Sequence, residues 1–179
     1  MPANYQNKFC QNCPYCNAKH LPSYLQGLPL NSEIRKTKTL LVFQSPGINE
    51  WTGNSGEDKP APLISNSSTS TAARLRKSFC RIHKKRTDFD ITETVQCYPG
   101  QYSNKRDKKP RIAAINQCSH HLAKDIQENT YSKIISFGVF ANNIVDEIIK
   151  KQNITVQHIK LPHPSSGKLS NLVLDANLK

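Results

Sequence analysis

The sequence predicts an α/β fold of three layers (αβα), in which helices cover both faces of a central four-stranded, mostly parallel sheet. Four short apolar runs have the length and composition of buried strands, and helical patterns separate them. Strands that alternate with helices form βαβ units, whose parallel sheet is covered on both faces. A chain of 179 residues is long enough for one core and short for two. We therefore expect a single domain over residues 1–179.

Each expected strand is rich in Ile, Leu, Val or Phe and ends at Pro, Gly or a polar residue. The four runs are Thr39 to Gln44, Asp90 to Val95, Tyr131 to Phe137 and Val156 to Leu161. The first expected helix follows a Ser/Thr-rich stretch that can cap it, the second begins after Pro110, and the third carries a stripe of Ile and Val. These helices cover Thr71 to Phe79, Ile112 to Ile126 and Phe140 to Lys151.

The composition indicates a basic protein. It has 25 Lys and Arg residues against 13 Asp and Glu, a net charge of +12, so polyanions are its expected partners. No apolar stretch reaches the roughly 18 to 20 residues that a membrane-spanning helix needs, and residues 1–10 lack the apolar run of a secretory signal. We expect a cytoplasmic protein without a membrane segment, whose six cysteines are metal ligands or reduced thiols and not disulfides.

The positive charge is concentrated in one part of the chain. Between Arg74 and Arg111 lie twelve Lys and Arg residues and four acidic ones. Clustering of this density is typical of a surface that binds the phosphates of a nucleic acid, although a solvated basic face has the same composition.

Polar segments follow three of the four expected strands. They are Gln44 to Glu50, Gln96 to Gly100 and Pro162 to Gly167. The carboxyl ends of parallel strands meet at one edge of a sheet, where ligands of such folds bind. A long polar segment at residues 53–70 follows the first of them and is too long for a simple connection. We expect the functional site at this edge.

Three motifs in these segments resemble those of the uracil-DNA glycosylase superfamily: Pro46-Gly47-x-x-Glu50, Cys97-x-Pro99-Gly100 and His163-Pro164-Ser165. The resemblance is greatest to the iron–sulfur family 4 branch and runs from Cys10 to about Ser166. It implies a monomeric DNA glycosylase that flips a nucleotide, hydrolyses its N-glycosidic bond and leaves an abasic site.

The resemblance also implies a metal centre. Cys10-x-x-Cys13-Pro14 is similar to the amino-terminal motif of the family, and Cys97 and Cys118 stand where its other two ligands fall. Four thiolates suit a [4Fe-4S] cluster, and the same set could hold zinc. Cys16 could replace Cys10, because it has the same spacing from Cys13. The remaining alternative is that these cysteines are reduced thiols that bind no metal.

The resemblance assigns catalysis and DNA binding to residues near the end of the chain. His163 would donate a hydrogen bond to the base as its bond to the sugar breaks. Ser165 and Ser166 would clamp a phosphate beside the flipped nucleotide. Further DNA contacts are expected from Lys168 and from the basic loop residues Arg106, Lys108, Lys109 and Arg111.

The first loop departs from the family pattern. The family has a Glu, its water activator, where this chain has Gln44, and an amide can position water but cannot take its proton. Glu50 is a candidate replacement. The neighbouring Ser45, Pro46 and Gly47 are expected to line the base pocket.

The residues expected to recognise the base also depart from the family pattern. The family has an Asn that pairs with uracil where this chain has Glu93, and an ionised carboxylate can only accept hydrogen bonds. The family's stacking aromatic is missing, because Ala61 and Leu63 stand in that segment. We therefore expect a roomy pocket that favours a cytosine-type modified base. Such bases occur in phage DNA, so the protein would fit a role in anti-phage defence. Alternatives are that Glu93 is merely ion-paired, that ordinary uracil is repaired, or that the protein binds DNA without catalysis.

Overall fold

The computed structural model describes residues 13–15, 32–48 and 71–179, and all structural statements below refer to these residues. At its centre lies one sheet of four strands, β1 (Thr39–Phe43), β2 (Asp90–Glu93), β3 (Lys133–Phe137) and β4 (Gln157–Leu161). The strand order is β2-β1-β3-β4 and every pairing of neighbours is parallel. The predicted α/β class is confirmed.

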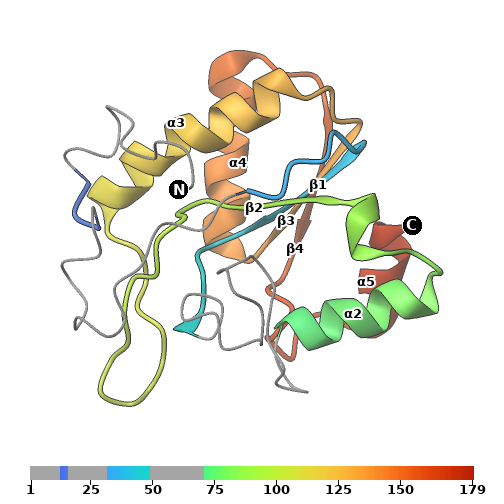
Figure 1. The fold of residues 1–179 in the computed structure, drawn as a ribbon, viewed down its shortest axis with the longest axis horizontal. Coiled ribbons are helices and arrows are strands. Elements are labelled where there is room, and N and C mark those ends of the chain that lie inside the picture. Colours follow the sequence, from blue (N-terminus) through green and yellow to red (C-terminus); the bar gives the residue numbers. More distant parts are fainter. Residues whose placement is uncertain (1–12, 16–31, 49–70) are drawn as a thin grey trace, which may run out of the picture.

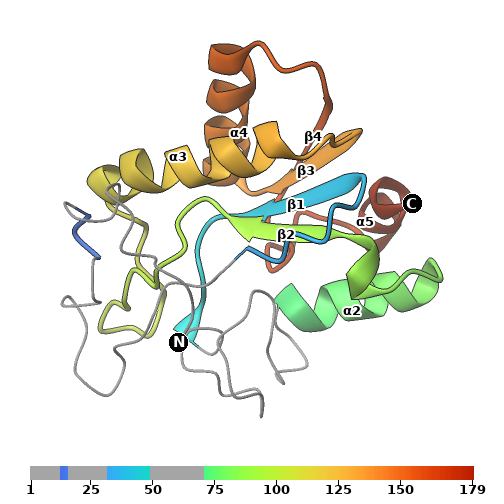
Figure 2. The ribbon, with the colours of Figure 1, turned by 45° about the horizontal axis from the view of Figure 1, so that its top comes forward.

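Four helices cover the sheet: α2 (Thr71–Arg81), α3 (Ile112–Glu128), α4 (Val139–Gln152) and α5 (Asn171–Leu178). Helices α3 and α4 lie on one face, and α2 and α5 lie on the other (Figures 1 and 2). The 3-10 turn η3 (Arg86–Asp88) precedes β2. Within the described part of the chain, no helix is both long enough and apolar enough to span a bilayer.

The two faces have separate apolar cores that follow the two-residue period of the strands. On the α2/α5 side, Leu41 and Phe43 of β1 are buried with Ile91, and the rings of Phe43 and Phe137 stack with centroids 4.7 Å apart. On the α3/α4 side, Leu40 and Val42 are buried against those helices. The sheet is therefore buried on both faces, as a parallel sheet requires.

The predicted elements differ from the observed ones at their ends. The strands were expected to extend one or two residues further, to Gln44 and Val95 or back to Tyr131 and Val156, whereas the helices run one or two residues beyond the expected bounds. Helix α5 was not expected. It has eight residues, and its amino end is capped by Ser170, whose Oγ accepts a hydrogen bond from the amide of Val173 at 3.2 Å.

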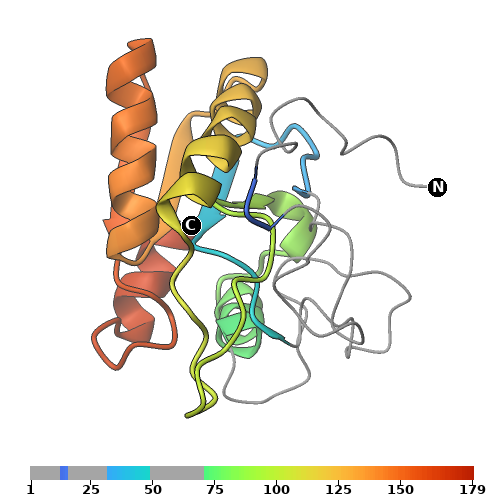
Figure 3. The same cartoon turned by 90° about the vertical axis from the view of Figure 1, so that its left-hand side faces the viewer.

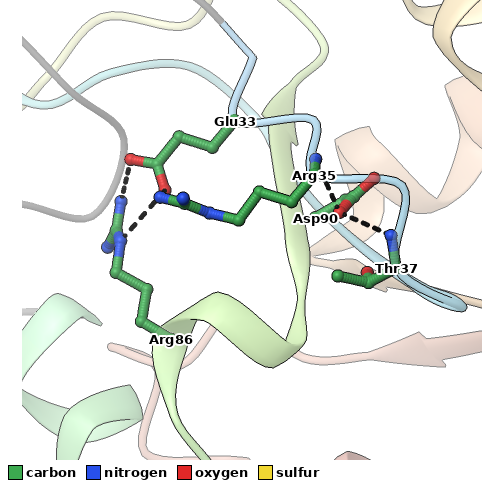
Figure 4. Close-up of polar contacts among 5 residues, drawn as sticks. All are labelled: Glu33, Arg35, Thr37, Arg86 and Asp90. Atoms are coloured by element: carbon green, nitrogen blue, oxygen red, sulfur yellow. Dashed lines mark hydrogen bonds and ion pairs between the residues drawn. The ribbon is translucent and has the colours of Figure 1, made fainter.

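The free edge of β2 is covered by the segment that leads into β1. Glu33 pairs antiparallel with Ile91 through two backbone hydrogen bonds of 2.7 and 3.0 Å. Its carboxylate accepts from Arg86 at 2.5 Å, and Asp90 accepts from the amides of Arg35 and Thr37 at 3.0 and 3.1 Å (Figure 4). This network fixes the start of β2 and thereby the position of its carboxyl end.

Two arginines of the basic stretch Arg74 to Arg111 form ion pairs within the fold. Arg81 forms a two-point ion pair with Asp175 of α5, and Arg86 pairs with Glu33. These arginines hold elements of the fold together. The expectation that this stretch binds phosphates therefore applies to its other exposed cations, which lie on α2, in the turn after α2 and in the loop between β2 and α3.

Candidate active site

The carboxyl edge of the sheet brings the predicted polar segments to one side of the molecule. Gln44 follows β1, Glu93 ends β2, and His163 stands two residues after β4. In the strand order, β1 and β2 are neighbours, whereas β3 separates β1 from β4. Gln44 and Glu93 are thus adjacent in the sheet, and His163 approaches from its other end.

The ends of β1 and β2 are tied together beyond their last paired residues. The amide of Thr94 donates to Phe43 O at 2.8 Å, and the amide of Val95 donates to Gln44 O at 3.1 Å. The hydroxyl of Thr94 donates to the same Gln44 oxygen. The backbone of Gln44 is therefore fixed. Gln44, Ser45 and Gly47 are half-buried, and Pro46 is buried.

Glu93 is almost completely enclosed. It is 4% exposed and pairs in register with Phe43 of β1. Because it follows Ile91 by two residues, it lies on the α2/α5 face of the sheet. A carboxyl group buried to this extent needs a compensating polar contact, either from the protein or from a ligand.

His163 is held by the loop that carries it. The hydroxyl of Ser165 lies 2.7 Å from Nδ1, and the amide of Ser165 donates to Nδ1 at 3.3 Å. Ser166 donates to the His163 carbonyl oxygen through its amide at 2.9 Å and its hydroxyl at 2.7 Å. Since an amide N–H can only donate, Nδ1 is an acceptor and the proton of the neutral ring resides on Nε2.

Burial favours that neutral form. It lowers the pKa of His163 below the usual 6.5, because a charged imidazolium is poorly solvated there. The ring also lies close to Gly138, which has a φ of +89° and whose amide donates to Leu161 O at 2.8 Å. A Cβ on Gly138 would stand 3.5 Å from Cβ of His163, an ordinary contact distance, so the positive φ and not a lack of space is what favours glycine here.

Arg74 of α2 closes the loop that carries His163. Its guanidinium donates to the carbonyl oxygens of Pro164 and Leu169 and, at 3.3 Å, to Oδ1 of Asn171. One side chain therefore connects both ends of the segment Pro164–Leu169 and the start of α5. Sequence reasoning counted Arg74 only as part of the basic stretch, because the contact spans 90 positions in the chain.

Three of the predicted metal ligands share one buried cluster. Cys13, Cys97 and Cys118 are 9%, 6% and 6% exposed and pack together with Tyr15 and Tyr98. Tyr15 accepts a hydrogen bond from the amide of Arg111 at 2.9 Å, which attaches the Cys13 segment to the start of α3. Among the residues that the structure describes, no three His, Cys, Asp or Glu side chains are arranged to hold a metal ion.

Several predicted site residues lie outside the described residues, namely Cys10, Cys16, Glu50, Ala61 and Leu63. The two candidates for a fourth thiol ligand, Cys10 and Cys16, are thus both outside the described residues. Cys13, Cys97 and Cys118 thus come from three segments that are distant in the sequence, and they share one buried cluster without forming a metal-binding group by themselves.

The expected DNA contacts are exposed. Arg106, Lys108, Lys109 and Arg111 all face solvent in the loop between β2 and α3, as do Ser165 and Lys168 after β4, whereas Ser166 is half-buried. Both loops extend from the same edge of the sheet (Figure 3). The edge therefore combines a neutral histidine with exposed cations on two loops, an arrangement that can bind a phosphate chain and stabilise negative charge on a reacting group.

A comparison with protein-family models gives one result for this chain. The model of the uracil DNA glycosylase superfamily matches residues 31–169, which includes all four strands and both loops described above. A search of curated proteins finds no match.

Proposed function

The chain belongs to the uracil DNA glycosylase superfamily, and from this premise we propose that it is a monomeric DNA glycosylase. It would flip a nucleotide out of DNA, hydrolyse the N-glycosidic bond and leave an abasic site. The observation that carries the proposal is the state of His163, a neutral imidazole whose Nε2–H is set by the Ser165 contacts at Nδ1.

His163 supplies the charge stabilisation that this reaction needs. When the bond between the base and C1′ breaks, its electron pair moves to the base, and Nε2–H donates a hydrogen bond to the base oxygen that gains charge. A donor already in place does not have to reorganise during the reaction, and each such donor contributes about 3 to 4 kcal/mol. The low pKa of His163 suits this role, because the ring remains neutral at pH 7 and keeps its proton.

Water completes the reaction by adding to C1′ and losing a proton. Gln44 has a fixed backbone at the end of β1, so its amide is suited to orient this water. An amide cannot accept the proton at neutral pH, and we assign that step to Glu50. Departure of the base before water attacks leaves an oxocarbenium-like sugar, for which a weak base is sufficient.

For the substrate we propose a cytosine-type modified pyrimidine. Glu93 is 4% exposed at the end of β2, beside the loop that the family uses for the base. A carboxylate accepts from the amino group of cytosine but opposes the carbonyl of uracil. Removal of normal cytosine would destroy the cell's own genome, so a substituent must provide discrimination. Modified cytosines in phage DNA would provide it, and defence against phages is the corresponding role.

For the cysteine cluster we propose that Cys13, Cys97 and Cys118, with Cys10 or Cys16, hold a [4Fe-4S] cluster, with zinc as the alternative. The support is the burial of three thiols in one cluster. A metal held there would join the Cys13 segment to the loop after β2 and to α3, so its contribution would be to stability.

The test is base release from DNAs of defined composition. The protein is incubated with DNA containing cytosine, 5-substituted cytosines or uracil, and the released bases are identified by mass spectrometry. Alkali-sensitive breaks that accompany a released modified cytosine support the proposal. Release of uracil alone would favour ordinary repair, and a gel shift without release or breaks would mean a non-catalytic DNA-binding protein.

A further inference from the structure

The loop between β2 and α3 contains a well-formed turn that the proposed catalysis does not use. We call residues 100–108 the basic hairpin. Its two arms pair antiparallel between Gln101 and Asp107, with the amide of Lys108 donating to Gly100 O at 2.8 Å and the amide of Tyr102 donating to Arg106 O at 2.9 Å. The loop is therefore ordered before any ligand binds.

The foot and the tip of the hairpin are both fixed. At the foot, the hydroxyl of buried Tyr98 donates to Asp107 at 3.0 Å. At the tip, the amide of Lys105 donates to Tyr102 O at 3.0 Å, and Lys105 has a φ of +60°. Glycine is the usual residue for that conformation, and the lysine found there places a cation at the tip.

The hairpin presents one aromatic ring to solvent among cations. Tyr102 is 53% exposed, although tyrosine usually buries most of its ring in a folded domain. The ammonium of Lys108 lies over this ring, 5.8 Å from its centroid. Lys105 and Arg106 are exposed on the hairpin, and exposed Lys109 directly follows it.

We propose that Tyr102 stacks on an unstacked base of the bound DNA strand, while the cations of the basic hairpin contact the neighbouring phosphates. An exposed ring beside a row of cations is the arrangement with which proteins bind single-stranded nucleic acid, because every base offers a face for stacking. The hairpin follows β2 and the His163 loop follows β4, so both extend from the edge where a strand would be opened (Figure 3).

This inference rests on the proposed function, because a glycosylase opens the stack when it flips a nucleotide. It goes beyond that function in giving Tyr102 a role that depends on the state of the DNA. A perfect duplex has its base faces covered by their neighbours, so the ring finds a partner only in single-stranded or opened DNA. The phosphates, by comparison, can be contacted in a perfect duplex as well as in single-stranded or opened DNA.

The test compares binding to one fluorescein-labelled oligodeoxynucleotide of mixed sequence, as a single strand and as a perfect duplex, by fluorescence anisotropy at fixed salt. Tyr102→Ala should weaken single-strand binding about fivefold or more, the effect expected for loss of one stacked base, and duplex binding less than about twofold. Tyr102→Phe should retain wild-type affinity and Tyr102→Leu should not, because the ring and not the hydroxyl is required.

Two controls separate stacking from charge and from general loss of apolar surface. Arg106→Ala should weaken binding to both probes by similar factors, since it removes a phosphate contact. Ile112→Ala, which truncates another exposed apolar side chain, should change neither. Equal effects of Tyr102→Ala on both probes, or none on the single strand, would overturn the inference and leave the glycosylase proposal intact. Failure of the wild type to bind either probe would overturn both.

Discussion

Arg74 of α2 donates a hydrogen bond to the carbonyl oxygen of Pro164, the residue that directly follows His163. The same guanidinium donates a hydrogen bond to the carbonyl oxygen of Leu169 at the far end of the loop. A residue from another layer of the fold thus holds the loop that carries the proposed hydrogen-bond donor.

The first prediction concerns this positioning contact. Arg74→Gln should slow single-turnover base release on the order of tenfold, because the loop that carries His163 loses a charged hydrogen-bond donor, while the affinity for DNA changes little. Lys150→Gln, which removes a positive charge from an exposed position near the end of α4 and outside the basic stretch, is the matched control and should leave both quantities unchanged. A parallel loss of affinity in Arg74→Gln would indicate a direct DNA contact instead of positioning.

The second prediction concerns base choice. Glu93→Asn should shift preference from a cytosine-type base toward uracil, because the amide of Asn can donate to the uracil carbonyl that a carboxylate opposes. An opposed pair of acceptors in a buried pocket costs roughly 1 to 3 kcal/mol, so the ratio of the two release rates should move about tenfold or more. Efficient uracil release by the wild type, with little change in Glu93→Asn, would favour ordinary uracil repair.

The third prediction concerns the cysteine cluster. Anaerobically purified protein should be brown and contain iron and sulfide, and Cys97→Ala should lose the colour and unfold at a lower temperature, because a structural metal contributes folding free energy directly. Cys80→Ala is the control, since Cys80 is exposed and lies outside the expected ligand set. A colourless wild type with stoichiometric zinc would establish the alternative metal. A fully stable Cys97→Ala protein would exclude a structural site.

The fourth prediction concerns pH. Burial lowers the pKa of His121, His158 and His163 from 6.5 in the folded protein. As the pH falls below 6.5, the unfolded chain therefore binds protons at these positions before the folded chain does, and the free energy of unfolding decreases. Urea unfolding followed at several values between about pH 7.5 and pH 5.5 should show this decrease. A free energy of unfolding that stays constant or rises as the pH falls over that interval would contradict the burial assigned to these three histidines.

The sequence predicted the sheet well because the strand signals are local. In β1, for example, the four residues from Leu40 to Phe43 are all apolar and buried, and polar residues bound them. Helix α5 was missed because its eight residues offer only Leu174 and Leu178 as buried positions, too few for a clear helical period.

The contacts of the candidate site could be predicted only where both partners lie within one short motif. His163 and Ser165 are neighbours in sequence, and their contact could be expected from the motif. The contact of Arg74 with Pro164 joins positions far apart in the chain, and no local pattern distinguishes this arginine from the others of the basic stretch. The exposure of Tyr102 likewise depends on how the hairpin folds, because its sequence does not specify which side of the loop faces solvent.

The most direct test of the account is single-turnover release of a modified cytosine from DNA by the wild type and by His163→Ala. We expect release by the wild type and a loss of about a hundredfold or more in His163→Ala, with DNA affinity retained, because the Nε2–H donor acts mainly in the transition state. Near-normal release by His163→Ala would contradict the central claim that this neutral histidine stabilises the departing base.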